Sequence, residues 1–211
     1  KRGTVFDHAV ATSSWTAPST ASIHTSLHPI QNGVLSGIVS VKDMQNTNSV
    51  LEMNRIPSDV ETLAEMLGKE GYQTFGVSDN LNICKEEGFD QGFDQLVTLN
   101  NLGADVVGRR VGKWRDRDKD HRPFFLYVHY MDPHAPYLPR RPWYRSGGGE
   151  LENTIAAYDS EIRFVDEHLS DMCETLNLGE NTLLIVTSDH GEEFGEHGGL
   201  DHGRTLYQEV V

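Results

Sequence analysis

The sequence has little cysteine and no long apolar run. Cys84 and Cys173 are the only two cysteines among 211 residues, and they stand far apart with no Cys-x-x-Cys spacing. This argues against a zinc knuckle or a dithiol redox centre. The two could still form one disulfide, because the sequence does not fix their separation in space. No apolar run approaches the ~20 residues that are needed to span a bilayer.

Basic residues are also scarce. Eighteen Lys and Arg against 32 Asp and Glu give a net charge of -14 at pH 7. Nucleic acids and anionic membranes are polyanions that such a chain repels at long range, so neither is an expected partner. Most of this charge is expected to be solvated surface, but acidic residues near a site would favour a cation.

Apolar runs alternate with amphipathic stretches along the chain. The length suits one domain with a single sizeable core. We predict core strands in the last three apolar runs and either a strand or a turn-rich connection in the first: residues 37–41, 74–77, 124–130 and 182–187. We predict helices at residues 59–69, with Gly71 as the C-cap, and at residues 154–176. The charged stretch 109–122 predicts a solvated helix or loop. Strands alternating with helices indicate an α/β domain with a largely parallel sheet.

A polar cluster directly follows the last apolar run. Ser188, Asp189, His190 and Gly191 come where the predicted strand ends. Ligands in open α/β sheets bind at the carboxyl ends of strands, and a carboxylate next to an imidazole suits one divalent metal. The alternative is an ordinary helix N-cap, which would not need the histidine.

A second cluster, at residues 13–26, is rich in hydroxyl groups around Pro18. Proline favours the first turn of a helix, which places Thr16 at a helix N-terminus. Exposed amides there attract oxyanions and lower the pKa of a nucleophile. Taken alone, this cluster is more simply a helix cap than a nucleophile.

Together the two clusters resemble the sulfatase branch of the alkaline phosphatase superfamily. The family's nucleophile segment reads Cys or Ser, any residue, Pro, Ser, Arg and a small residue, and residues 16–21 have the same spacing. The resemblance continues through residues 62–72, 88–93, 129–137, 158–161 and 202–207. It implies an alkaline-phosphatase-like three-layer sandwich, with a mostly parallel central sheet flanked by helices. We expect residues 1–211 to form a single domain of this kind, truncated at both ends.

The departures from the family pattern narrow the expected chemistry. Thr16 and Thr20 replace the family's oxidised Cys or Ser and its Arg, and threonine cannot give formylglycine. Relatives among the phosphatases and transferases use threonine directly. The resemblance thus implies a metal-dependent hydrolase or transferase of sulfate or phosphate esters, with a covalent intermediate on Thr16 and a small-molecule, lipid or glycan substrate. The alternatives are a pseudoenzyme that binds an anion without turnover, and a structural domain with a vestigial metal site.

The resemblance also implies roles for individual residues. Asp189 and His190 would bind one divalent ion, Mn²⁺, Ca²⁺, Mg²⁺ or Zn²⁺, with Thr16 bridging metal and substrate. The family's upstream acidic ligand is not in this chain. His134 and His202 would contact the transferred group or the leaving oxygen.

Other assignments stay open at this point. His134 could equally be a loop histidine bonded to backbone. His197 either joins a metal or phosphate shell or is a bystander, and Asp132 and His129 are less favoured as ligands. The sequence fixes neither the localisation nor the oligomeric state.

Overall fold

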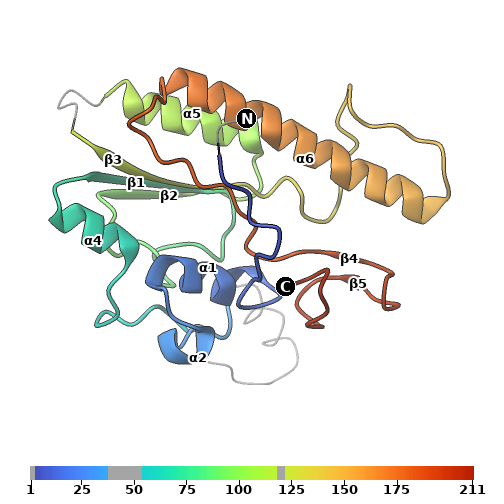
Figure 1. The fold of residues 1–211 in the computed structure, drawn as a ribbon, viewed down its shortest axis with the longest axis horizontal. Helices are drawn as coiled ribbons and strands as arrows, with labels where there is room; N and C mark the ends of the chain where they lie inside the picture. The colour runs from blue at the N-terminus through green and yellow to red at the C-terminus, as the bar shows by residue number, and fades with distance from the viewer. Residues whose placement is uncertain (1–2, 38–53, 118–121) are drawn as a thin grey trace.

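The computed structural model of the chain describes residues 3–37, 54–117 and 122–211. Its centre is a parallel sheet of order β2-β1-β3, made of β1 (Gln73–Ser78), β2 (Gln95–Thr98) and β3 (Phe124–His129). Helices α5 (Ala104–Arg115) and α6 (Glu150–Thr175) lie over one face. Helices α1 (Thr16–Thr25), α2 (Pro29–Asn32) and α4 (Leu63–Lys69) lie on the other side (Figure 1). This is the predicted three-layer α/β arrangement with a parallel sheet.

Each face of the sheet has its own core. Val107 and Val111, one helical turn apart on α5, are fully buried against Phe75 of β1 and Met172 of α6. A second cluster on the opposite side includes Ala17, Ala21, Val34, Ile56, Ile83 and Phe89. The three strands are parallel, so their carboxyl ends meet at one edge, where ligands bind in folds of this type.

The helix predicted over residues 59–69 begins later than expected. Thr62 caps α4: its hydroxyl accepts from the Glu65 amide at 3.2 Å, and the Glu65 carboxylate accepts from the Thr62 amide at 2.8 Å. This reciprocal capping box fixes the first turn at Leu63. At the other end Gly71 takes the left-handed conformation, with φ at +85°, as predicted for a residue that follows a helix.

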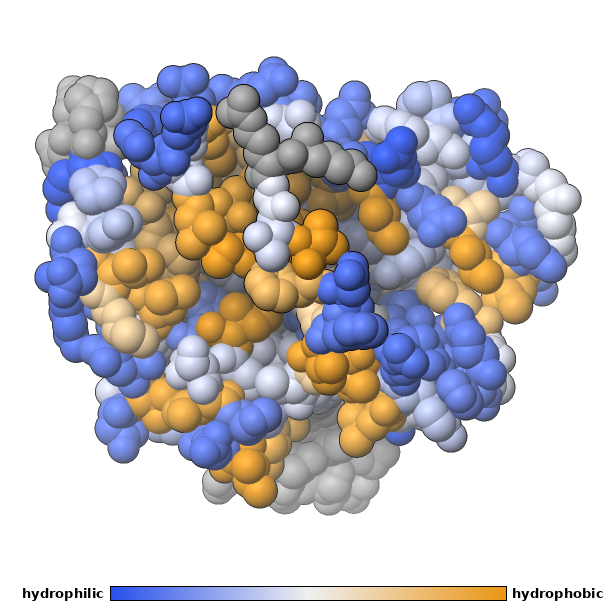
Figure 2. All heavy atoms as spheres, in the orientation of Figure 1, coloured by the Kyte–Doolittle hydropathy of each residue, from blue (hydrophilic) through white to orange (hydrophobic). Residues whose placement is uncertain are grey.

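The other predicted elements are present with small shifts in their bounds, except for two. Residues 38–41 of the first apolar run lie outside the described residues. The prediction of a core strand at residues 182–187 is wrong, because no strand forms there and Leu183, Leu184, Ile185 and Val186 are 84%, 51%, 74% and 68% exposed. A strand needs a hydrogen-bonded neighbour, and no described segment pairs with this one. Figure 2 shows apolar side chains gathered near the middle of the molecular face in view.

The structure also answers what the sequence left open about the two cysteines and the charged stretch 109–122. Cys84 and Cys173 are both free thiols. Residues 109–115 of the charged stretch lie in α5, which is buried at Val107 and Val111 and exposed at Arg109, Arg110 and Lys113, whereas residues 118–121 lie outside the described residues. Among the helices of the described residues, none is both long and apolar enough to cross a bilayer. A short hairpin that the sequence did not suggest, β4 (Glu193–Phe194) with β5 (Leu200–Asp201), lies near the C-terminus (Figure 1).

His24 is a buried histidine on the side of α1 that faces the sheet. Its ring lies among Phe89, Phe93 and Tyr127 at centroid distances of 5.7, 5.9 and 4.4 Å. Burial, with a smaller contribution from the charge of His129, lowers the pKa of His24 to about 4. The folded state therefore holds this ring neutral where the unfolded chain would protonate it.

We expect His24 to make stability depend on pH. Its pKa is depressed in the folded state, so its contribution is complete above the unfolded value of 6.5 and falls as the pH drops towards about 4. Between about pH 7 and pH 5 the free energy of unfolding should fall by about 2 kcal/mol from this group alone. Urea unfolding of His24→Phe should lack this component, whereas the exposed-site variant His8→Gln should retain it. An unchanged pH dependence in His24→Phe would contradict the assignment.

Candidate active site at the carboxyl edge of the sheet

Thr16 lies at the start of α1, beneath the carboxyl edge of the sheet. It is 4% exposed, and Trp15 precedes it as the N-cap residue in an extended conformation. Its Oγ1 lies 3.4 Å from Nε2 of His190 and 3.4 Å from Nδ2 of Asn80. The hydroxyl is thus held between segments that are 174 and 64 positions away in the sequence.

Asp189 and His190 reach Thr16 from the end of the extended segment. Nδ1 of His190 donates to the Gly191 carbonyl at 2.8 Å, which leaves Nε2 with a free lone pair directed at Thr16. That same Nε2 lies 3.6 Å from Oδ2 of Asp189. Oδ2 is buried and accepts no hydrogen bond from any described residue. A buried, unpartnered carboxylate oxygen beside an imidazole lone pair fits a divalent cation, since metal-bound histidines use their other nitrogen to bond backbone carbonyls.

His202 lies on the far side of His190 and faces two carboxylates. The two rings are 4.3 Å apart, and Nδ1 of His202 lies 3.0 Å from both Glu192 Oε1 and Asp201 Oδ1. Burial opposes charging of the ring. The hydrogen bond and charge of Glu192, together with the charge of Asp201, nevertheless raise the pKa of His202 above its usual value. The site thus contains an imidazole that holds a proton more readily than an ordinary histidine does.

His134 completes the group from the loop after β3. Its ring centroid lies 5.0 Å from that of His202, and its Nδ1 donates to the Ala135 carbonyl at 2.8 Å. The structure therefore brings together all five residues predicted for the site: Thr16, His134, Asp189, His190 and His202. The backbone contact considered for His134 is also present, and it orients the ring.

Three less favoured candidates have other partners. Asp132 bonds Arg140 at 3.1 Å. His129 ends β3, with its Nδ1 3.5 Å from the Tyr127 hydroxyl. His197 lies against Glu209, with Nδ1 2.5 Å from Oε1, and stacks on Tyr207 at 3.7 Å.

Several residues near the site were missed by sequence reasoning. Asn80 follows β1 just as Asp189 follows its own apolar run, so the strand-end rule could have found it. Ser19 donates its hydroxyl to the Asp189 carbonyl and ties α1 to that segment. Glu192 and Asp201 had no signal beyond their closeness to His190 and His202 in sequence, because their pairing depends on the hairpin that folds back between them.

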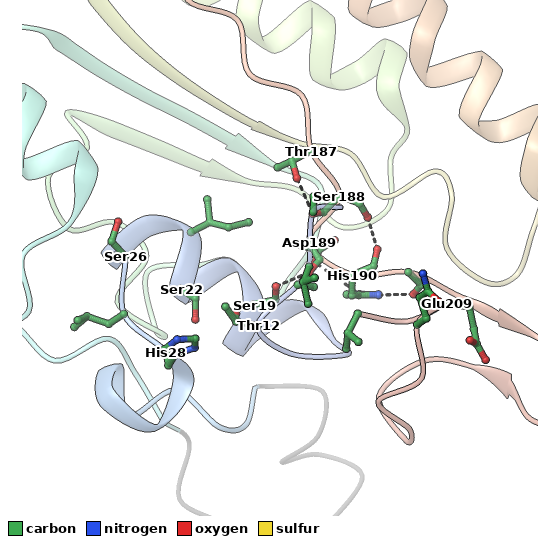
Figure 3. Close-up of a pocket in the computed structure, with 18 of the residues that line it drawn as sticks. Thr12, Ser19, Ser22, Ser26, His28, Thr187, Ser188, Asp189, His190 and Glu209 are labelled. Atoms are coloured by element: carbon green, nitrogen blue, oxygen red, sulfur yellow. Dashed lines mark hydrogen bonds and ion pairs between the residues drawn. The ribbon is translucent and has the colours of Figure 1, made fainter. Parts of the chain in front are cut away.

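A cavity of about 590 Å³ opens beside Asp189 and His190. One wall is α1, with Ser19, Ser22 and Ile23, and the other is the segment of residues 187–191 (Figure 3). The hollow reaches Asp189 and His190 along the helix, but Thr16, His134 and His202 are not among the residues that line it.

Gly191 has no room for a side chain. A Cβ there would lie 2.0 Å from the backbone oxygen of Glu209. The backbone amide of Gly191 donates to the Val210 carbonyl at 3.1 Å. We expect Gly191→Ala to lower the free energy of unfolding by about 2 to 3 kcal/mol, because the backbone must shift to relieve the clash. Gly179→Ala is the matched control, since a Cβ there meets nothing within 4 Å. Equal midpoints in urea for the two variants would show that the C-terminal segment is not packed there as described.

The fold and the edge site define an alkaline-phosphatase-like α/β domain. The Sulfatase family profile matches residues 1–117 and 113–209, and the chain belongs to the sulfatase family.

Known proteins agree with this assignment. The N-sulphoglucosamine sulphohydrolase of Homo sapiens is 29% identical, and the match covers 92% of this chain and 45% of that protein. The phosphatidylethanolamine transferase Mcr-2 of Escherichia coli is 27% identical over 58% of this chain and 22% of its own length. A putative sulfatase structure from Bacteroides thetaiotaomicron superposes with a TM-score of 0.73 at 16% identity, over 100% of this chain and 55% of that one. The chain thus spans less than half the length of these two curated relatives.

Proposed function

We propose that the chain carries the nucleophile side of the active site of a metal-dependent hydrolase or transferase of sulfate or phosphate esters. The observation that carries this proposal is that His190 Nε2 lies 3.4 Å from Thr16 Oγ1 and 3.6 Å from the unpartnered Oδ2 of Asp189. Membership of the sulfatase family supports the reaction class. One of the two curated relatives is named a sulphohydrolase, and the other is named a phosphatidylethanolamine transferase.

Asp189, His190 and Thr16 are the residues that would hold one divalent cation. A carboxylate oxygen with an imidazole nitrogen suits Mn²⁺ or Zn²⁺, and Mg²⁺ or Ca²⁺ would need more oxygen ligands. A cation bound there would lower the pKa of the Thr16 hydroxyl, so that its proton is lost to water, and would polarise the ester. The hydrogen bond from His190 Nδ1 to Gly191 keeps the imidazole in the required tautomer.

Thr16 is the proposed nucleophile. Its Oγ1 forms a bond to phosphorus or sulfur while the bond from that atom to the ester oxygen breaks, and the bonding pair leaves with the ester oxygen. Water or an acceptor alcohol then attacks the same atom, gives up its proton, and releases Thr16. Hydrolysis and transfer differ only in that second acceptor.

His202 is the proposed acid for the leaving oxygen. Glu192 and Asp201 raise the pKa of the ring above its usual value, so the ring holds a proton more readily than a free histidine would. The proton passes from the ring to the departing oxygen and is replaced when the second nucleophile loses its own. Nδ1 of His134 is occupied by Ala135, so Nε2 is the nitrogen that meets the transferred group.

The test is turnover by the full-length protein before and after removal of metal. p-Nitrophenyl phosphate and p-nitrophenyl sulfate serve as probes for the two ester classes. We expect at least one to be hydrolysed, the activity to disappear with a chelator, and Mn²⁺ or Zn²⁺ to restore it. Turnover that ignores the chelator would refute the metal-dependent mechanism, and binding of inorganic phosphate or sulfate with no turnover of any ester would identify an anion-binding domain instead.

A further inference from the structure

Asn80 is a buried amide whose nitrogen points at the proposed nucleophile. It follows the carboxyl end of β1 and is 4% exposed. Nδ2 lies 3.4 Å from Thr16 Oγ1 and 3.3 Å from the sulfur of Met131. No role for this residue follows from the family resemblance or from the metal site described above.

The orientation of the Asn80 amide is fixed by its neighbours. Oδ1 accepts from the Asn82 backbone amide at 2.9 Å, which a flipped amide could not do. The Ser78 hydroxyl also accepts from the backbone amide of Asn80 at 3.1 Å and donates to its backbone carbonyl at 3.0 Å, which holds the backbone of this residue. The N–H groups of the side chain are thus held towards Thr16 rather than free to turn away.

Both groups near Nδ2 are weak hydrogen-bond acceptors while Thr16 is uncharged. A thioether is a poor acceptor, and 3.4 Å is long for a bond to a neutral hydroxyl. Such a donor gains strength when its acceptor becomes charged, because a hydrogen bond to an anion is roughly twice as strong as one between neutral groups. Interactions that strengthen only as charge develops lower the barrier rather than tighten substrate binding.

We propose that Asn80 is a catalytic residue that donates a hydrogen bond to Oγ1 of Thr16 when this oxygen carries negative charge. This rests on the proposed function, in which Thr16 loses its proton, bonds to phosphorus or sulfur, and recovers the electron pair when the intermediate breaks down. Asn80 transfers no proton in either step. It stabilises Oγ1 before the bond forms and again after the bond breaks.

The test compares Asn80→Ala with Asn80→Asp. We expect Asn80→Ala to lower kcat by about 10²-fold with KM changed by less than about threefold, as for the loss of one oxyanion donor. Asn80→Asp keeps the shape and the acceptor for Asn82, but it places a carboxylate against Oγ1. It should therefore be at least as impaired as the alanine variant. A purely structural role gives the opposite order, because the aspartate preserves the packing.

Two controls separate this inference from the proposed function. Asn100→Asp adds the same charge at an exposed position after β2 and should keep full activity. Thr16→Ala, measured in the same assay, tests the nucleophile independently. Suppose that Thr16→Ala is inactive. The inference then fails, and the proposed function stands, if Asn80→Asp has a higher kcat than Asn80→Ala or if Asn80→Ala keeps kcat within threefold of the unaltered protein. If Thr16→Ala is active, the proposed function fails.

Discussion

Thr16→Ala should lower kcat/KM for any ester that the full-length protein turns over by at least about 10³-fold, equivalent to ~4 kcal/mol of transition-state stabilisation. The variant has no side-chain oxygen to form the intermediate, while the backbone of α1 and the contacts of His190 with Gly191 are retained. The measurement is steady-state kinetics with the better of the two p-nitrophenyl esters.

Two further variants make that result specific. Thr16→Ser keeps the oxygen and should retain a measurable fraction of the activity. Thr154→Ala removes a threonine hydroxyl from α6, far along the chain from the site. Within the described part of the chain this hydroxyl donates to the Glu150 carbonyl of its own helix, and the variant should match the unaltered protein. A Thr16→Ala variant as active as Thr154→Ala would show that another group is the nucleophile.

Asp189→Ala should weaken binding of Mn²⁺ or Zn²⁺ by about 10²-fold or more. Oδ2 of Asp189 is buried without a hydrogen bond from the described residues, which leaves it able to bind the proposed cation. Asp189→Asn keeps the shape and removes only the charge. It should lie closer to the alanine variant than to the unaltered protein, because an amide oxygen is a weaker ligand than a carboxylate.

Metal titration of the folded chain by calorimetry checks this prediction. Asp171→Asn, at an exposed position on α6, is the matched control and should leave the affinity unchanged. Equal affinities for Asp189→Ala and Asp171→Asn would place the cation elsewhere, and the group Glu193, His197 and Glu209 would then be the first to examine.

The sequence predicts this fold well where local pattern and final packing agree. Val107 and Val111 are one helical turn apart, and both are buried, as an amphipathic helix requires. Residues 182–187 show where the pattern fails. Their apolar character indicates a buried strand, but burial also needs a partner, and hydrophobic periodicity carries no information about which segment lies alongside.

The candidate site was proposed from the sequence for a different reason. Thr16 and Asp189 were candidates because two clusters stand in the order of a known family, and the structure brings these clusters together through His190, which lies near both residues. Asn80, Glu192 and Asp201 could not be assigned with equal force. Each contacts one specific side chain of the candidate site, and such pairings are set by loop and hairpin geometry rather than by residue type.

The central claim is that Thr16 carries the transferred group during turnover. It is tested most directly by quenching the full-length protein with acid during reaction with a phosphate or sulfate ester and sequencing the Thr16 peptide by mass spectrometry. The account predicts the added mass of one phosphoryl or sulfuryl group on Thr16, absent without metal and absent from Thr16→Ala. An active protein whose peptide is never modified under rapid quenching, or is modified at another residue, would contradict it.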